Sequence, residues 1–239
     1  MLRSFFLPLL ALLLLSACSR RADPPPPPPT DAAPEPSLAG RVLHRGAALP
    51  APSAPEPCHP APPLITGVDG GLADVLVHLP GLPSAAPGEL ELSADGCAFS
   101  PRVAAVPLGT VLVVANDGPG LQTFHLHRLD GTQERPEQNL ALPPGAALLR
   151  YTLDRPGRYR IAADARPWMQ AFLWVVEGGA TTVSDGDGRF SLEVPPGDWT
   201  AELWHPALGR RSEGVGVPAD GPGSLYVTWS ESGEDAPGR

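Results

Sequence analysis

Residues 110–128 read Thr-Val-Leu-Val-Val-Ala-Asn-Asp-Gly-Pro-Gly-Leu-Gln-Thr-Phe-His-Leu-His-Arg, and this stretch decides the fold class. Its first part, 110–115, is a run of apolar and β-branched residues, and 123–128 alternates apolar with polar side chains. Both patterns are typical of short β-strands. Aspartate, glycine and proline lie between the two runs and favour a turn. The stretch therefore predicts two strands that are joined by a short connection.

The same pattern continues on both sides of this stretch, from Leu38 onward. Further alternating or β-branched runs lie at 41–45, 74–79, 89–93, 147–153, 157–162, 171–177, 189–194, 200–205 and 224–229. Turn sequences such as Asp185-Gly-Asp-Gly and Pro195-Pro-Gly-Asp separate them. No stretch keeps the 3.6-residue apolar period of an amphipathic helix. We therefore predict an all-β protein, and about 200 residues suffice for one large β-sandwich or two small ones, of which we favour two.

The first eighteen residues carry a separate targeting signal. Arg3 precedes an apolar run at 5–15, and Leu15-Ser-Ala-Cys18 resembles the lipobox of bacterial lipoproteins. The run is shorter than the roughly 20 residues of a membrane-spanning helix, so it indicates a signal peptide, residues 1–17. The resemblance implies cleavage before Cys18 and acylation of that cysteine, which attaches the protein to a membrane. The alternative is an ordinary secretory signal in which Cys18 has no role.

Residues 18–37 form a linker between the lipid-carrying cysteine and the folded part. They include six consecutive prolines at 24–29, which favour an extended polyproline II spacer, and we expect the linker to be disordered. Ser19 stands where an aspartate often marks retention at the inner membrane. We therefore expect a lipid-anchored protein of the cell envelope, held at the outer membrane and facing the periplasm or the cell surface.

The charge of the chain argues against nucleic acid as a partner. The formal net charge is −9, and removal of Arg3 with the signal peptide makes it −10. All 17 basic residues are arginines, and they form no basic cluster. No nucleophile elbow, zinc-protease motif or phosphate-binding loop is present, so the sequence predicts a protein that is not an enzyme.

Two cysteines remain once Cys18 is assigned to the lipid anchor. Cys58 and Cys97 are an even pair in an oxidising compartment, which favours a disulfide. Two free thiols are the alternative.

The middle of the chain, 89–177, resembles the cupredoxins, the Greek-key β-sandwiches that hold a type 1 copper. The matching segments are Cys97-Ala-Phe-Ser-Pro, Val106-Pro-Leu-Gly-Thr, the stretch from Val113 to His125, and Asp164-Ala-Arg-Pro-Trp-Met. Asn116, Pro167, Trp168 and Met169 fall where the family pattern has the same residues.

The copper ligands of that pattern are mostly absent. A type 1 site needs two imidazoles, one thiolate and a weak axial methionine. The resemblance puts Gln122 at the first histidine, Ala163 at the thiolate, Arg166 at the second histidine and Met169 at the axial position. Ala163 has no donor atom, and Arg166 brings a fixed positive charge. The resemblance thus implies a cupredoxin scaffold that holds no metal and needs no cofactor.

An alternative copper site is built from other residues. His125 and His127 lie two apart on an expected strand, so they share one face and are candidates for chelating a metal. A third ligand, such as Asp164 or His205, cannot be placed from the sequence. The simpler interpretation is a hydrogen-bonded surface pair.

The C-terminal part resembles a carboxypeptidase regulatory-like domain, a small sandwich of the transthyretin or immunoglobulin type. The matching segments, within 180–229, are Thr182-Val-Ser-Asp-Gly-Asp-Gly-Arg-Phe and Val194-Pro-Pro-Gly-Asp-Trp. The expected organisation is therefore a cupredoxin-like domain at 38–177, the second sandwich at 178–231 and a disordered tail at 232–239. Residues 38–87 either open the cupredoxin-like domain or pair with the C-terminal sandwich, in which case the cupredoxin-like part is an insertion.

These observations together predict a non-enzymatic, lipid-anchored envelope protein with a binding or structural role. Its expected partners are the membrane and an envelope or periplasmic protein. The alternative is a periplasmic copper-binding or electron-transfer protein with a rebuilt metal site. The five tryptophans, at 168, 174, 199, 204 and 229, are spread too widely in the sequence to indicate a carbohydrate platform. A further hypothesis is that Arg166 and Gln122 contact an anion.

Overall fold

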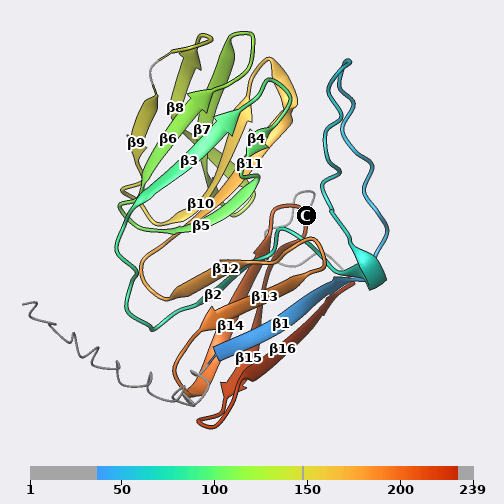
Figure 1. The fold of residues 1–239 in the computed structure, drawn as a ribbon, viewed down its shortest axis with the longest axis vertical. Coiled ribbons are helices and arrows are strands. Elements are labelled where there is room, and N and C mark those ends of the chain that lie inside the picture. Colours follow the sequence, from blue (N-terminus) through green and yellow to red (C-terminus); the bar gives the residue numbers. More distant parts are fainter. Residues whose placement is uncertain (1–36, 147, 231–239) are drawn as a thin grey trace, which may run out of the picture. The chain divides into compact units, whose positions relative to one another are not determined.

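The computed structural model describes residues 37–146 and 148–230, which belong to one compact unit. The signal peptide, Cys18, the proline run and the tail 232–239 lie outside the described residues. Within them the fold is all-β, as predicted, with sixteen strands and one short 3-10 helix (Val68–Gly70) (Figure 1). No helix among the described residues is long and apolar enough to cross a membrane.

The middle sandwich consists of the strands β3 to β11. Its two sheets have the orders β5-β11-β10-β7-β8 and β4-β3-β6-β9. Their bounds are β3 (Glu89–Ala94), β4 (Phe99–Ser100), β5 (Val103–Pro107), β6 (Val111–Asn116), β7 (Gln122–Asp130), β8 (Gln133–Leu142), β9 (Leu149–Thr152), β10 (Gly157–Ala163) and β11 (Arg166–Val176).

The core of the middle sandwich forms because successive side chains of a strand point to opposite faces. In β7, Phe124 and Leu126 are buried, whereas His125 and His127, which alternate with them, are on the outer face. In β11, the inward positions are Met169, Ala171, Leu173 and Val175. They pack against Leu92, Leu112 and Val114 of the opposite sheet.

The terminal sandwich consists of the seven remaining strands. Its sheets have the orders β13-β1-β16 and β12-β2-β14-β15. Their bounds are β1 (Ser37–His44), β2 (Leu76–Leu79), β12 (Ala180–Val183), β13 (Arg189–Glu193), β14 (Gly197–His205), β15 (Gly209–Val217) and β16 (Gly223–Trp229). The core includes Leu38, Val42, Val77, Leu203, Val227 and Trp229.

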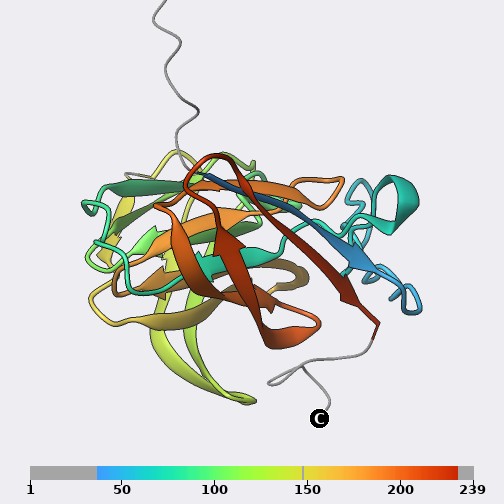
Figure 2. The same cartoon turned by 90° about the horizontal axis from the view of Figure 1, so that it is seen from below.

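The first two strands of the chain lie in the terminal sandwich. β1 pairs with β13 in antiparallel and with β16 in parallel orientation, and β2 pairs with β12 and β14 (Figures 1 and 2). Of the two arrangements left open for residues 38–87, strand pairing therefore gives the one in which these strands join the C-terminal sandwich. The strands of the middle sandwich are inserted between β2 and β12.

An aromatic contact joins the two sandwiches. Trp204 of β14 lies with its ring centroid 6.2 Å from that of Phe172 and 6.4 Å from that of Trp174, both on β11 and both in edge-to-face geometry. Leu76 of β2 and Val103 of β5 are buried in the same cluster. The outer face of the five-stranded sheet is thus partly covered by the terminal sandwich.

A long proline-rich loop, residues 45–66, separates β1 from the segment that leads to β2 (Figure 1). A disulfide links Cys58 of this loop to Cys97 in the β3–β4 connection, with the two Cα atoms 5.2 Å apart. The predicted disulfide is therefore confirmed, and it ties the loop to the middle sandwich. Arg102 adds a hydrogen bond from Nη2 to the carbonyl of Pro63, 3.0 Å long.

Candidate functional site

The four positions that the sequence aligns with copper ligands lie on β7 and on the β10–β11 hairpin. Gln122 is the first residue of β7, Ala163 is the last of β10, and Arg166 opens β11 opposite Ala163. Gln122, Ala163 and Met169 are each about 1% exposed. Met169 and Ala163 are packed in the apolar core of the middle sandwich.

A direct hydrogen bond joins two of these positions. Nη1 of Arg166 donates to Oε1 of Gln122 at 2.9 Å and to the carbonyl of Leu121 at 3.1 Å. The amide oxygen of Gln122 is therefore already used by a cation. Nε2 of Gln122 is buried and has no hydrogen-bond partner among the described residues.

These side chains do not fit a type 1 copper. Ala163 has no donor atom, the guanidinium of Arg166 keeps its charge, and the thioether of Met169 is the weakest ligand of the set. That Arg166 and Gln122 contact an anion stays a prediction. Arg166 does use two of its hydrogen bonds within the protein.

His125 and His127 lie beside each other on the outer face of the five-stranded sheet. Their ring centroids are 3.9 Å apart with an angle of 34° between the planes, so the rings are loosely stacked. Nδ1 of His125 is 3.0 Å from Oδ1 of Asp164, and this hydrogen bond is the main reason that the pKa of Asp164 is lowered. The sequence could not place Asp164, and the structure brings it to His125.

His127 is held in a more enclosed position. Its Nδ1 is 3.7 Å from Oε2 of Glu134, and burial, followed by the nearby His125 and Arg160, lowers its pKa. Glu134 receives two hydrogen bonds from Arg160, the one from Nε being 2.8 Å long, and this lowers the pKa of Glu134.

The other proposed third ligand, His205, belongs to β14 of the terminal sandwich. Its Nδ1 accepts a hydrogen bond from the backbone N–H of Ala207 at 3.1 Å. Across the residues that the structure describes, no three or more histidines, cysteines, aspartates and glutamates are arranged to hold a metal ion.

Three rows of side chains cross the outer face of this sheet from β7 to β10 to β11. The strand register aligns Leu129 with Arg158 and Trp174, His127 with Arg160 and Phe172, and His125 with Ala162 and Gln170. Alternation along each strand puts all nine on one face. The face therefore combines aromatic rings, guanidinium groups, two imidazoles and one amide.

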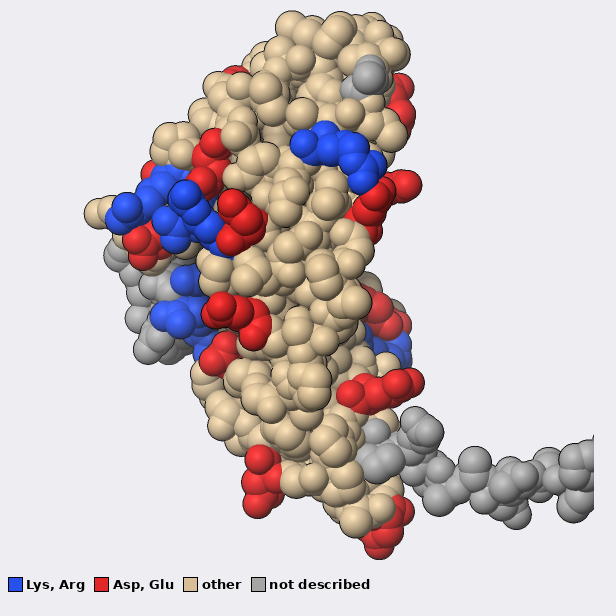
Figure 3. Space-filling model, turned by 90° about the vertical axis from the view of Figure 1, so that its left-hand side faces the viewer, with Lys and Arg blue, Asp and Glu red and all other residues tan. Residues whose placement is uncertain are grey.

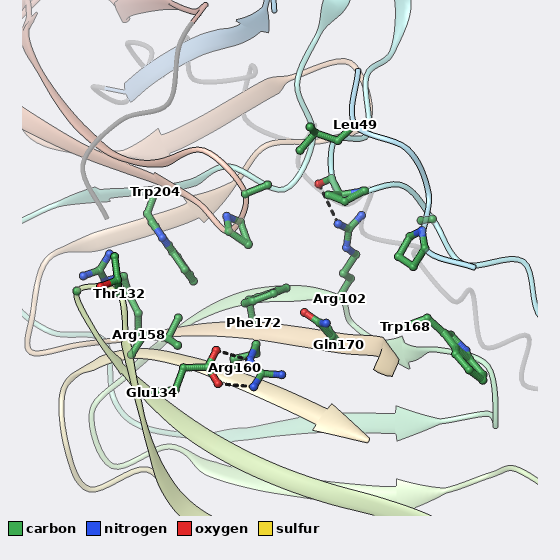
Figure 4. Close-up of a pocket in the computed structure, with 17 residues that line it drawn as sticks. Leu49, Arg102, Thr132, Glu134, Arg158, Arg160, Trp168, Gln170, Phe172 and Trp204 are labelled. Atoms are coloured by element: carbon green, nitrogen blue, oxygen red, sulfur yellow. Dashed lines mark hydrogen bonds and ion pairs between the residues drawn. The ribbon is translucent and has the colours of Figure 1, made fainter. Parts of the chain in front are cut away.

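A cleft of about 650 Å³ lies over this face. Its floor includes Phe172, Gln170 and Arg160, and Trp168 lies at one end (Figure 4). Leu49, Pro52 and Pro63 of the proline-rich loop contribute one wall, and Trp204, Pro206 and Ala207 of the terminal sandwich contribute another. The disulfide between Cys58 and Cys97 holds the loop that forms the first wall.

The charged groups of the cleft are mainly positive. Arg102, Arg158 and Arg160 line it, together with a single carboxylate, that of Glu134. Arg158 lies over the ring of Trp204, 5.7 Å from its centroid. Just outside the lining, Asp74 pairs with Arg102 at 3.2 Å, and burial raises the pKa of Asp74. On the face shown in Figure 3, arginines lie next to acidic side chains, and much of the remaining surface is uncharged.

In the sequence the tryptophans are too widely spread to indicate one site, and the structure brings two of them to this cleft. Trp168 and Trp204 both line it, and Trp174 contacts Trp204, although the three are far apart in sequence. Trp199 donates its Nε1 proton to the carbonyl of Pro195, and Trp229 is in the core of the terminal sandwich. The alternation at 157–162 and 171–177 was the available signal for Arg158, Arg160 and Phe172, and Gln170 lies just before the second run. Alternation alone could not show which face of the five-stranded sheet the terminal sandwich covers.

Comparison with known proteins gives a distant structural similarity. No protein-family model and no curated protein matches the chain. The chain is similar to a purple cupredoxin from Nitrosopumilus maritimus, with 16% identity, coverage of 36% of this chain and 98% of that chain, and a TM-score of 0.31. It is also similar to auracyanin A, a blue copper protein from Chloroflexus aurantiacus, with 14% identity, coverage of 38% of this chain and 100% of that chain, and a TM-score of 0.30.

A copper-containing nitrite reductase from Thermus scotoductus is also similar, with 16% identity and a TM-score of 0.31. That match covers 57% of this chain and only 28% of the reductase. At these values the comparisons concern the fold and carry no information about copper in this chain.

Proposed function

We propose that this chain is a copper-free binding protein of the cell envelope, built on a cupredoxin-like sandwich. The main support is the hydrogen bond from Arg166 to Gln122. These two residues stand at two of the four positions where the family pattern has copper ligands, and they bond to each other. A cation bound there would meet the fixed charge of Arg166 and no thiolate. Electron transfer through a type 1 centre is therefore disfavoured.

A binding role is supported by the outer face of the five-stranded sheet. Binding sites are typically concave and apolar, with a few convergent polar groups. The cleft has this composition, because Trp168, Phe172 and Trp204 line it together with arginine side chains and Gln170. The lipid on Cys18 and the linker 18–37 would tether the folded part to a membrane.

Copper analysis of the mature chain tests this proposal. We expect the natural chain to purify without stoichiometric copper and to show no blue absorption after copper is added. The triple variant Gln122→His, Ala163→Cys, Arg166→His restores the ligand set, and we expect it to turn blue. Stoichiometric copper in the natural chain would contradict the proposal.

Copper binding through a rebuilt site is the second candidate function. It is favoured by the 3.9 Å separation of the His125 and His127 rings, which puts two imidazoles within reach of one ion. If the natural chain does bind copper, the variants His125→Ala and His127→Ala decide where. Loss of binding in both assigns the metal to this pair, and retention excludes it.

A further inference from the structure

The described chain ends next to two segments that lead to the lining of the cleft. The backbone N–H of Arg45 donates to the carbonyl of Trp229 at 3.0 Å, and Nη1 of Arg211 donates to the carbonyl of Thr228 at 2.8 Å. Arg45 begins the proline-rich loop, whose Leu49 and Pro52 line the cleft. The β14–β15 connection, which precedes Arg211 in the chain, contributes Pro206 and Ala207 to the lining. The end of β16 is thus hydrogen-bonded to Arg45, four residues before Leu49 of the cleft lining, and to Arg211 of β15, four residues after Ala207 of the lining.

The segment that follows β16 and Ser230 is acidic. Residues 231–239 read Glu-Ser-Gly-Glu-Asp-Ala-Pro-Gly-Arg, with three carboxylates and one arginine. The segment has no large apolar side chain. Extended, nine residues span about 30 Å at roughly 3.3–3.6 Å per residue, so the carboxylates can reach a neighbouring surface.

The cleft has the complementary charge. Among the described residues, three guanidinium groups and one carboxylate line it, in a chain whose formal net charge is −9, and Asp74 pairs with one of the three, Arg102, from outside the lining. A guanidinium carries five N–H donors, so the two hydrogen bonds of Arg160 to Glu134 do not saturate it. Charge-assisted hydrogen bonds from arginine to a carboxylate are among the stronger ones.

We propose that the cleft is a binding site for an acidic, extended peptide segment and that residues 231–239 of the same chain are its occupant. Attachment at Ser230 gives the segment an effective concentration of about a millimolar, so weak intrinsic binding is sufficient. An external acidic segment then binds only by displacing it. This inference gives the proposed binding role a site and a ligand class, and its test does not involve copper.

A peptide of sequence 231–239 with blocked ends is the probe. It is titrated calorimetrically into the full mature chain and into the chain that ends at Ser230. We expect binding to the shortened chain, weakened several-fold when salt is raised from 50 to about 500 mM, because exposed charges are screened. The full chain should bind at least tenfold more weakly, since its own segment competes. The peptide with Gln and Asn in place of Glu and Asp should not bind.

Matched variants locate the contact. Arg160→Gln in the shortened chain should weaken the binding of the peptide about tenfold. Arg150→Gln removes the same charge from the opposite sheet, where Arg150 pairs with Glu89, and should leave the peptide affinity unchanged. Should Arg160→Gln fail to fold, the Nε–H NMR signals of the three cleft arginines are compared between the full and shortened chains. We expect them to shift.

Four results would overturn the proposal. The peptide binds neither chain and the arginine signals are the same in both, or it binds both chains equally, or it binds the two arginine variants alike. A further outcome is dimerisation of the full chain that is lost on shortening. That result would assign the segment to the cleft of a second copy and contradict docking within one chain.

Discussion

Arg166 and Gln122 are 44 residues apart in the sequence and are joined by a hydrogen bond of 2.9 Å from Nη1 to Oε1. The bond connects the start of β11 to the start of β7. Because Gln122 is about 1% exposed, its amide oxygen depends on this partner. In this protein the two side chains therefore act as a structural pair.

Removal of Arg166 should destabilise the fold. We expect Arg166→Ala to lower the free energy of unfolding by about 1–3 kcal/mol, since a buried acceptor loses its donor. The double variant Arg166→Ala, Gln122→Leu should recover part of this loss, because both polar partners are gone. Arg150→Ala, which breaks an exposed ion pair with Glu89, should cost less than about 1 kcal/mol. Equal losses for Arg166→Ala and Arg150→Ala in urea unfolding would contradict the pairing.

The stability should fall as the pH is lowered from 6.5, mainly because of His205. Burial lowers the pKa of His205 from 6.5 to about 3 in the folded protein. Below pH 6.5 the unfolded chain therefore binds a proton that the folded protein does not, and unfolding is favoured by up to about 1.4 kcal/mol per pH unit. Burial also lowers the pKa values of His44 and His127, which adds to the effect in the same direction.

Substitution of His205 by asparagine isolates the contribution of His205 to the pH dependence of the stability. The amide oxygen of asparagine can accept the hydrogen bond from the N–H of Ala207 but does not titrate. We expect His205→Asn to be less stable at pH 7.5 and to lose clearly less stability between pH 7.5 and 5 than the natural chain. His59 is exposed in the proline-rich loop, and His59→Asn should keep the natural pH dependence. An unchanged slope in His205→Asn would assign the acid sensitivity to other groups.

How far the sequence predicts the fold depends on how apolar each strand is. The strands β7 and β11 bury alternate side chains over most of their length, and β6, β10 and β14 each bury three apolar or aromatic side chains in succession, so their sequence pattern indicates them within a few residues. Gln133–Leu142, which forms β8, was missed because it is an edge strand with mostly polar side chains and with Pro136 opposite a bulge in β7. Gly209–Val217, which forms β15, is also an edge strand and carries Arg210, Arg211 and Glu213.

The cleft could not be predicted because its members come from distant segments. Phe172 and Trp204 meet only when the terminal sandwich packs against β11, and local periodicity does not report that contact. The wall formed by the loop 45–66 depends on the disulfide between Cys58 and Cys97. That disulfide could be predicted, because two cysteines remain after Cys18 and the expected compartment is oxidising. The position of that loop could not be derived from its proline-rich composition.

The lipid anchor is a prediction from the sequence alone, and Cys18 carries it. We expect the natural protein to be found in the membrane fraction and to incorporate labelled palmitate. Cys18→Ala should abolish labelling and prevent cleavage by lipoprotein signal peptidase, leaving an uncleaved precursor. Cys58→Ala serves as the control for loss of a cysteine and should still be labelled. Labelling that persists in Cys18→Ala would contradict the assignment.

The disulfide between Cys58 and Cys97 should contribute a large share of the stability. It closes a loop with a sequence separation of 39 residues, for which the chain-entropy treatment gives about 4 kcal/mol. We expect the double variant Cys58→Ser, Cys97→Ser to lower the free energy of unfolding by up to this amount. Reduction of the natural protein should have a similar effect, whereas the same reductant should not change the double variant further. Because the loop 45–66 walls the cleft, both treatments should also weaken binding of the 231–239 peptide to the chain that ends at Ser230. If stability falls while peptide affinity stays the same, the loop is not needed for the site, and the floor formed by β10 and β11 must bind the peptide by itself.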